Sequence, residues 1–208
     1  DRVIPVIEAL RRETGLPLSI DTTKSGVARS AIASGAEFVN DISGLCFDEG
    51  MAEVVAETGA GLFVMHTRGR PDDMQKNTRY GDLMGEIIGS LGASVQRALS
   101  AGISREKLAV DTGIGFAKSA EGNLEVLSRL GELKTLGLPI LLGTSRKTFI
   151  GKVLDRPKPE DRLFGTMATV ALGVERGAHV FRVHDILSAR ETALMAWAVC
   201  RGKMPLSA

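Results

Sequence analysis

The sequence is poor in aromatic side chains, and it has neither a long apolar run nor an excess of charge of one sign. Aromatic residues make up 4% of the 208 residues, so the hydrophobic core must be built from aliphatic side chains and alanine, as in α/β proteins. No apolar run approaches the roughly 20 residues that span a bilayer, and no secretory signal opens the chain. Lys and Arg (26) balance Asp and Glu (25), so no global field attracts nucleic acid or a membrane.

Cysteine is also scarce, and no metal-binding motif is present. Cys46 and Cys200 lie far apart in the sequence, and neither has the spacing of a metal ligand. We expect both to be buried, reduced thiols, which predicts a cytoplasmic protein. No cluster of His, Cys and carboxylate side chains has ligand spacing either, so we predict no metal ion bound by protein side chains alone.

Short apolar runs alternate with amphipathic helical segments along the whole chain, which gives six strand–helix units. The expected strands are Leu16–Ile20, Phe38–Val39, Gly61–Met65, Leu108–Val110, Ile140–Leu142 and His179–Val183. The expected helices are Arg2–Thr14, Ser25–Ser34, Glu49–Thr58, Asp82–Ser100, Glu121–Leu136, Arg162–Arg176 and Leu187–Arg201, with a loop over Arg70–Tyr80. Strict alternation of this kind predicts a parallel sheet with helical crossovers.

The ends of the expected strands favour a closed barrel over an open, doubly wound sheet. Every strand ends in polar side chains, whereas an open sheet concentrates its site at one or two switch points. We therefore expect one (β/α)8 TIM-barrel domain over residues 1–208. The chain begins inside a helix and is two units short of a full barrel, so we expect that residues are absent from it or that another segment or subunit completes the ring.

The segment Gly143–Gly151 combines hydroxyls, a guanidinium and an ammonium at the carboxyl end of an apolar run. This composition indicates a site for a polar or anionic ligand. The alternative is a helix N-terminus that Thr144 or Ser145 caps, with Arg146 and Lys147 solvated.

Arg182 and His184 are two residues apart on one expected strand, so their side chains point to the same face. A guanidinium beside an imidazole is well suited to bind phosphate or pyrophosphate. The alternative is a salt bridge at the rim, because such pairs are common at protein surfaces.

Asp21 and Asp111 end two separate strands and, across a cavity, could bind a heterocycle rich in N–H groups. Asn40 complements them because it supplies both a donor and an acceptor. Each carboxylate also has a structural alternative: Asp21 could cap the helix near Ser25, and Asp111 could bond the Gly113–Gly115 turn.

Two features carry less information. The Gly113-Ile114-Gly115 turn only weakly matches a dinucleotide-binding fingerprint, because Lys118 holds the third glycine position. A doubly wound nucleotide-binding protein therefore remains as an alternative. His66 is ambiguous, and His179 is expected to be structural.

Taken together, these segments resemble the dihydropteroate synthase family of pterin-binding TIM barrels. The matching stretches occur in the family's order and cover essentially the whole chain; they are Ser19–Thr22, Phe38–Gly44, Met65–Gly69, Asp111–Phe116, Gly143–Gly151 and Arg182–Asp185. Within them, Ser145-Arg146-Lys147-Thr148-Phe149-Ile150-Gly151 and Met65-His66 are the most specific.

The resemblance implies condensation of a dihydropterin methyl pyrophosphate with para-aminobenzoate in folate biosynthesis, with Mg²⁺ as cofactor. The implied catalytic residues are Asp21, Asp111, Lys147, Arg182 and His184; Asp21, Asp111 and Lys147 bond the pterin, and Arg182 and His184 hold the pyrophosphate. The implied substrate-binding residues are Asn40, Ile42 and Met65 for the pterin, and Phe116, Arg146 and Thr148 for aminobenzoate. The resemblance also implies competition by sulfonamides and a homodimer through the last helices, without nucleic acid or membrane partners.

The chain departs from the family pattern at a few points. Thr112 stands where the family usually has proline, and Thr148 replaces a usual serine. The family places two loops and a Mg²⁺-binding asparagine ahead of the segment seen here, so we expect this chain alone to bind pterin with little turnover. The alternatives are a methyltetrahydrofolate:corrinoid methyltransferase, which has a similar pterin site, and a non-catalytic pterin-binding module.

Overall fold

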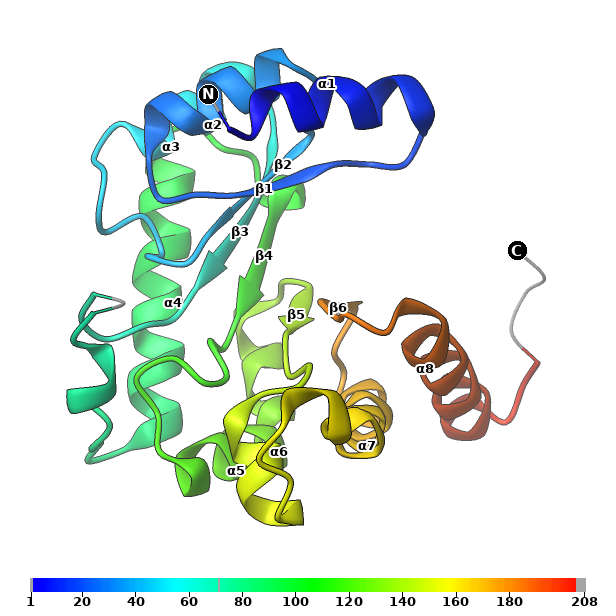
Figure 1. Cartoon of the computed structure of the whole chain (residues 1–208). Coiled ribbons are helices and arrows are strands. Elements are labelled where there is room, and N and C mark those ends of the chain that lie inside the picture. Colours follow the sequence, from blue (N-terminus) through cyan, green and yellow to red (C-terminus); the bar gives the residue numbers. More distant parts are fainter. Residues whose placement is uncertain (1, 71, 205–208) are drawn as a thin grey trace. The chain divides into compact units, whose positions relative to one another are not determined.

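The computed structural model describes residues 2–70 and 72–204, and the chain folds into two compact units (Figure 1). The first unit comprises Asp1–Thr67 and Ile87–Asp111, and the second comprises Arg68–Glu86 and Thr112–Ala208. Pro71, which belongs to the predicted loop Arg70–Tyr80, lies outside the described residues.

The first unit is built on four parallel strands that pair in sequence order. These are β1 (Ser19–Asp21), β2 (Phe38–Asp41), β3 (Gly61–Met65) and β4 (Leu108–Asp111). Its helices are α1 (Ile4–Glu13), α2 (Ser25–Ala33), α3 (Met51–Thr58) and most of α4 (Leu83–Ser100), with a 3-10 turn η2 (Arg105–Lys107) before β4. Figure 1 shows α4 alongside β3 and β4.

The two faces of these strands differ in chemistry because side chains alternate along a strand. One face is apolar: Ile20, Val39, Leu62 and Val110 are at most 8% exposed, and the helices contribute buried aliphatic and alanine side chains. The other face carries Asp21, Asn40, Met65 and Asp111, which the register brings into lateral rows: Asp21 lies opposite Asn40, and Met65 lies opposite Asp111.

The second unit contains a parallel strand pair and the remaining helices. Strand β5 (Ile140–Leu142) pairs with β6 (Val180–Phe181), so that Leu142 lies opposite Phe181. The helices are α5 (Ala120–Ser128), α6 (Thr148–Leu154), α7 (Leu163–Glu175) and α8 (Ile186–Arg201), and the 3-10 turns are η1 (Met74–Lys76), η3 (Leu130–Leu136) and η4 (Pro159–Arg162). Gly173 lets α7 approach the strands closely, because a Cβ there would lie 2.6 Å from Leu142 Cδ2.

Several predicted boundaries and one burial prediction are wrong. The segment predicted as one helix over Glu121–Leu136 is α5 followed by the 3-10 turn η3, and the predicted loop over Arg70–Tyr80 contains η1. Strand β6 ends at Phe181, so Arg182 and His184 lie beyond it instead of on it. Cys46 and Cys200 are free but exposed, not buried. Within residues 2–70 and 72–204, no helix is both long and apolar enough to cross a membrane.

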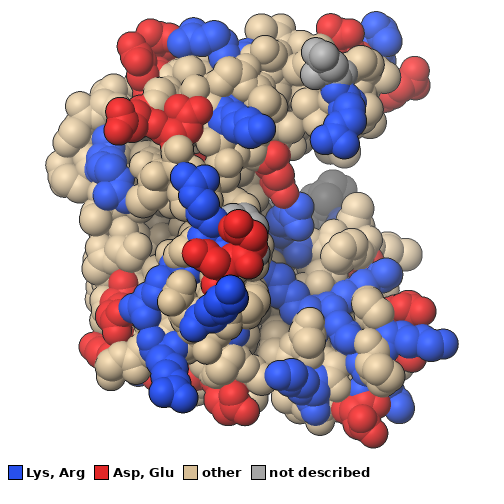
Figure 2. All heavy atoms as spheres, turned by 60° about the vertical axis from the view of Figure 1, so that its left-hand side comes forward, with Lys and Arg blue, Asp and Glu red and all other residues tan. Residues whose placement is uncertain are grey.

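The surface matches the balanced composition. On the face drawn in Figure 2, Lys and Arg side chains alternate with Asp and Glu and are separated by uncharged surface. Anion binding must therefore depend on particular side chains at a site, as the sequence predicts.

Candidate functional site

The first unit brings five predicted site residues to the carboxyl ends of its strands. Asp21, Asn40, Met65 and Asp111 share one face of β1–β4, and Ile42 follows the last residue of β2. Asn40 (5% exposed), Met65 (3%) and Asp111 (6%) are buried, whereas Asp21 is exposed and Ile42 is half-buried. The four strand residues thus lie at the carboxyl ends of their strands on one face, and their roles in binding stay predictions.

Asn40 and Asp21 form a polar pair with one unused acceptor. The Asn40 Nδ2 donates to Asp21 Oδ1 at 2.9 Å, whereas the buried Asn40 Oδ1 has no hydrogen-bond partner. A buried acceptor without a partner costs about 1–3 kcal/mol, so a group of this kind in a folded protein points to a ligand donor. The pair therefore presents the Asn40 Oδ1 acceptor beside the Asp21 carboxylate, on the face where the sequence predicts a site for a heterocycle.

Another carboxylate, that of Asp48, lies at the start of the helix that the sequence analysis considered for Asp21. Helix α2 has Lys24 at its N-cap, and no side chain of that residue caps the helix. Instead, the backbone N–H of Ser25 donates to Asp48 Oδ2 at 2.7 Å. Asp48 thus bonds the first N–H of this helix, and Asp21 accepts from Asn40 on the strand face.

A buried aspartate that was not among the predicted site residues fixes the turn after β2. Asp41 is fully buried, and its carboxylate accepts the backbone N–H groups of Ser43 and Leu45, each at 2.8 Å. The turn also contains Gly44 at φ +61°, where a Cβ would lie 2.8 Å from the Met65 carbonyl. These hydrogen bonds fix the backbone at Ile42. The alternation of side chains along a strand does not predict such a turn.

The β5–α6 loop of the second unit uses its hydroxyls for tertiary contacts and not for a helix cap. Lys147 occupies the N-cap position of α6, and its side chain makes no cap hydrogen bond. The Thr144 hydroxyl bonds Thr169 Oγ1 at 2.7 Å, and the Ser145 hydroxyl bonds His184 Nδ1 at 2.8 Å. The alternative in which Thr144 or Ser145 caps a helix is therefore wrong.

Arg146 is fixed through both its backbone and its side chain. It adopts a left-handed conformation (φ +58°), its N–H donates to Thr166 Oγ1, and its carbonyl accepts from Arg162 Nη1. Its guanidinium binds the Asp185 carboxylate through Nε (3.0 Å) and Nη2 (2.6 Å). These hydrogen bonds hold the pKa of Asp185 below its usual value and raise the pKa of Arg146.

Lys147 and Phe116 lie together in the second unit. The Lys147 ammonium donates to the Ile114 carbonyl and lies 4.9 Å from the centroid of the Phe116 ring. Both side chains are half-buried, so an aromatic face and a cation are presented side by side. This pair is suited to an aromatic ligand that carries an anionic group.

Thr148, Arg182 and His184 are exposed, and His184 is bonded to the β5–α6 loop. Besides its ring contact, His184 donates its backbone N–H to Ser145 Oγ at 3.2 Å, which holds the segment after β6 against the β5–α6 loop. Arg182 continues the strand ladder by one bond, from its N–H to the Leu142 carbonyl at 3.1 Å. Ser145 and Asp185 were not predicted as site residues, since only tertiary structure shows that they orient His184 and Arg146.

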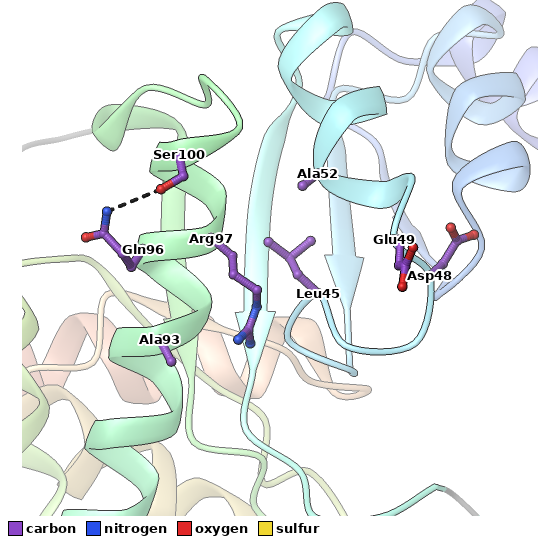
Figure 3. Close-up of a pocket in the computed structure, with 8 residues that line it drawn as sticks. All are labelled: Leu45, Asp48, Glu49, Ala52, Ala93, Gln96, Arg97 and Ser100. Atoms are coloured by element: carbon purple, nitrogen blue, oxygen red, sulfur yellow. Dashed lines mark hydrogen bonds between the residues drawn. The ribbon is translucent and has the colours of Figure 1, made fainter.

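Two hollows border these elements. In the second unit, a cavity of about 580 Å³ is lined by Lys147, Thr148 and Lys152, with Lys118 and Asn123 on its wall. In the first unit, a groove of about 540 Å³ runs between α3 and α4 and contains none of the predicted residues (Figure 3). Figure 3 shows Arg97 and Leu45 pointing into this groove, where Arg97 supports the turn by donating to the Gly44 carbonyl.

The described residues do not offer a protein-only metal site. Among residues 2–70 and 72–204, no group of three or more His, Cys, Asp or Glu side chains could hold a metal ion. His179 is structural as predicted: its Nδ1 accepts the Ile140 N–H at 3.2 Å.

Comparison with known proteins identifies the relatives of this chain. The family model described as pterin binding enzyme matches residues 1–184. Dihydropteroate synthase from Synechocystis is 47% identical over 201 residues, which are 97% of this chain and 70% of that protein. The chain thus spans about seven tenths of the length of this relative.

Two solved structures extend the likeness to the fold. Dihydropteroate synthase from Clostridium difficile, crystallised in the presence of pteroic acid, has a TM-score of 0.90 and 45% identity, with 95% of this chain and 73% of that chain covered. The Yersinia pestis enzyme in a sulfonamide complex has a TM-score of 0.93 and 37% identity, with 98% and 73% covered.

Proposed function

Because the chain belongs to the dihydropteroate synthase family of pterin-binding enzymes, we propose that it condenses 6-hydroxymethyl-7,8-dihydropterin pyrophosphate with para-aminobenzoate. The products are 7,8-dihydropteroate and pyrophosphate. Within the molecule, the observation that carries the proposal is the buried, unpartnered Asn40 Oδ1 beside the Asp21 carboxylate. A pterin supplies ring and exocyclic N–H donors that match these acceptors.

Most of the residues that we assign to the pterin belong to the first unit. When the C–O bond to pyrophosphate breaks, positive charge spreads from the methylene into the pterin ring. Asp21 and Asp111 stabilise that charge as acceptors for ring N–H groups, while Met65 and Ile42 supply apolar contacts. Asn40 is held by Asp21 and needs no reorganisation when the ring arrives.

The departing anion and the second substrate are assigned to residues of the second unit. Arg182 and His184 bind the pyrophosphate, and the Ser145 bond fixes the His184 ring in one orientation. Lys147 bonds the pterin. The amine of aminobenzoate needs only positioning, because the carbon it attacks is already cationic.

Aminobenzoate is assigned to Phe116, Arg146 and Thr148. The Phe116 face suits the benzoate ring. The side chain of Arg146 remains 34% exposed while paired with Asp185, so its guanidinium can also contact the substrate. A sulfonamide, which mimics aminobenzoate in shape and charge, should compete for the same residues. Pteroic acid, present with the Clostridium difficile enzyme, joins a pterin to para-aminobenzoate, as this assignment requires.

The magnesium prediction stays a proposal: among the described residues, no group of three or more His, Cys, Asp or Glu side chains could hold a metal ion by itself. We therefore assign no chemical step to a metal ion. In the family, as the resemblance implies, the asparagine that helps hold Mg²⁺ precedes the segment that this chain covers.

The finer points of architecture and assembly are also proposals. The parallel strands of each unit and the TM-scores support a (β/α)8 barrel. A homodimer through the last helices is supported by exposed apolar side chains on α8, among them Leu187 (68%), Met195 (65%) and Val199 (68%). Sedimentation velocity tests the dimer. The free thiols of Cys46 and Cys200 agree with a cytoplasmic protein.

Calorimetric titration distinguishes this function from its nearest rival. We expect the protein to bind the pterin pyrophosphate and not methyltetrahydrofolate, and Lys147→Ala to abolish pterin affinity because buried acceptors lose their donor. Lys203→Ala, an exposed lysine outside the predicted site, serves as the matched control. Tighter binding of methyltetrahydrofolate than of the pterin pyrophosphate would instead support the methyltransferase.

A further inference from the structure

The turn that carries Phe116 is held at every backbone carbonyl. From Gly113 to Ser119, each carbonyl oxygen accepts at least one hydrogen bond, and most of the donors are side chains from outside the turn or from its end. The side-chain donors are Gln75, Tyr80, Lys118, Asn123 and Lys147. Much of the turn is buried (Ile114 and Ala117 are 0% exposed and Lys118 is 4% exposed), so its carbonyl groups need protein donors in place of water, and these donors fix the path of the backbone.

The backbone of this turn is strained. Gly113 and Gly115 have positive φ values of 65° and 81°, which glycine adopts without penalty. Ala117 also lies in the left-handed region at φ +50°, and it is fully buried. A non-glycine residue in this conformation persists only where its surroundings hold it. Phe116 lies between this strained alanine and Gly115, which also has a positive φ.

Tyr80 holds the strained alanine. Its hydroxyl donates to the Ala117 carbonyl at 2.9 Å across a separation of 37 residues. Arg68 stacks on the Tyr80 ring at 4.0 Å and donates to the Arg79 carbonyl at 2.7 Å, which fixes the ring from behind. Gln75 donates at 2.9 Å to the carbonyl of Gly115, two residues before Ala117.

The same turn sets the two groups that we assigned to the substrates. The Lys147 ammonium bonds the Ile114 carbonyl, three residues before Ala117, and faces the Phe116 ring, whose position depends on the backbone at 116 and 117. If Ala117 relaxed to a negative φ, the peptide after Phe116 would rotate, and the ring would leave its position beside Lys147.

We propose that Tyr80 is a positioning residue that fixes the aminobenzoate-binding face of Phe116 through the Ala117 carbonyl. This inference rests on the proposed function and adds a specificity determinant on the segment between β3 and α4. Tyr80 touches no reacting atom in this scheme. It acts on the affinity for aminobenzoate and its mimics, and not on cleavage of the pyrophosphate.

The inference is tested by measuring kcat and KM for the Tyr80→Phe variant, expressed from the natural reading frame of the gene. Phenylalanine keeps the ring under Arg68 and removes only the hydroxyl. We expect the KM for aminobenzoate to rise about three- to tenfold, as the loss of one hydrogen bond predicts, and the affinity for a sulfonamide to fall by a similar factor. The kcat and the KM for the pterin pyrophosphate should stay within about twofold of the wild type.

Tyr80→Leu, which also removes the stacking surface of Arg68, should raise the KM for aminobenzoate further. Lys76→Gln, an exposed change on the same segment, is the matched control and should leave every constant unchanged. An unchanged KM for aminobenzoate in Tyr80→Phe would overturn the inference. A lower kcat, an equal rise in the KM values for both substrates and a lower unfolding midpoint would also overturn it. That combination would indicate that Tyr80 has only a structural role. A wild-type protein without synthase activity would instead refute the proposed function.

Discussion

Replacing Asn40 by leucine separates the stability of the fold from its binding of pterin. Asn40 is 5% exposed, its Nδ2 bonds Asp21, and its Oδ1 has no partner. If that oxygen accepts a hydrogen bond only from a bound ligand, asparagine lowers the stability of the protein without ligand and raises its affinity for the ligand. The variant should therefore gain stability and lose affinity.

The magnitudes follow from the contacts. Removing the unpartnered acceptor relieves about 1–3 kcal/mol, and burying a leucine side chain contributes about 1.5–3 kcal/mol. Loss of the bond to the charged Asp21 costs about 1.5–3 kcal/mol, and water reaches Asp21 because it is exposed. We expect a net gain of about 1–2 kcal/mol in the free energy of unfolding. Binding should weaken about 10- to 100-fold, because a buried pterin donor is left unpaired.

Urea unfolding and calorimetry with the pterin pyrophosphate measure the two effects. The matched control is Asn123→Leu, since Asn123 is also buried but bonds the Gly115 N–H and the Ser119 carbonyl. We expect that control to lose about 2–5 kcal/mol. A comparable loss in Asn40→Leu, or unchanged pterin affinity, would refute the reasoning about the free acceptor.

Three further predictions concern other parts of the molecule. Arg146 lowers the pKa of Asp185, so their pair stabilises the fold at pH values above the usual aspartate pKa of 3.8. The difference in free energy of unfolding between wild type and Asp185→Asn should shrink as the pH falls below 3.8. A difference that does not change with pH would contradict this. Gly44→Ala should lower the free energy of unfolding by about 1–3 kcal/mol, because its Cβ meets the Met65 carbonyl at a positive φ; a midpoint equal to the wild type would disprove the close contact. Arg182→Ala should weaken pterin pyrophosphate about 10- to 100-fold more than the bare pterin in calorimetry, and equal losses would remove Arg182 from the anion role.

The rows of site residues in the first unit could be predicted because they follow from local patterns. Each apolar run ends in a polar residue, and the parallel register places Asp21 opposite Asn40 and Met65 opposite Asp111. Period-2 alternation then assigns these side chains to one face. The register itself, which sets these residues opposite one another, comes from the structure.

Contacts between distant segments could not be predicted. Serine is a favoured N-cap residue, so the sequence allows Ser145 to cap a helix. In the structure its hydroxyl instead bonds His184, which is 39 residues away. Asp41 reads as part of a polar strand end, whereas its carboxylate holds the turn after β2. Tyr80 lies in a polar stretch without hydrophobic periodicity. Its hydrogen bond to Ala117 depends on the left-handed backbone of that residue, which the sequence does not predict.

The end of the last strand was missed for a related reason. His179–Val183 alternates as a strand should, yet the ladder of β5 stops at Leu142, so pairing ends at Phe181. The length of the partner strand set this boundary. Arg182 and His184 therefore owe their positions to the loop after β6 and to Ser145, not to strand periodicity.

Product analysis tests the central claim most directly. Protein from the natural reading frame is supplied with 6-hydroxymethyl-7,8-dihydropterin pyrophosphate and para-aminobenzoate, and dihydropteroate and pyrophosphate are quantified. We expect both products in equal amounts, with sulfonamides competing against aminobenzoate. The absence of both products, although the pterin pyrophosphate binds, would contradict this claim.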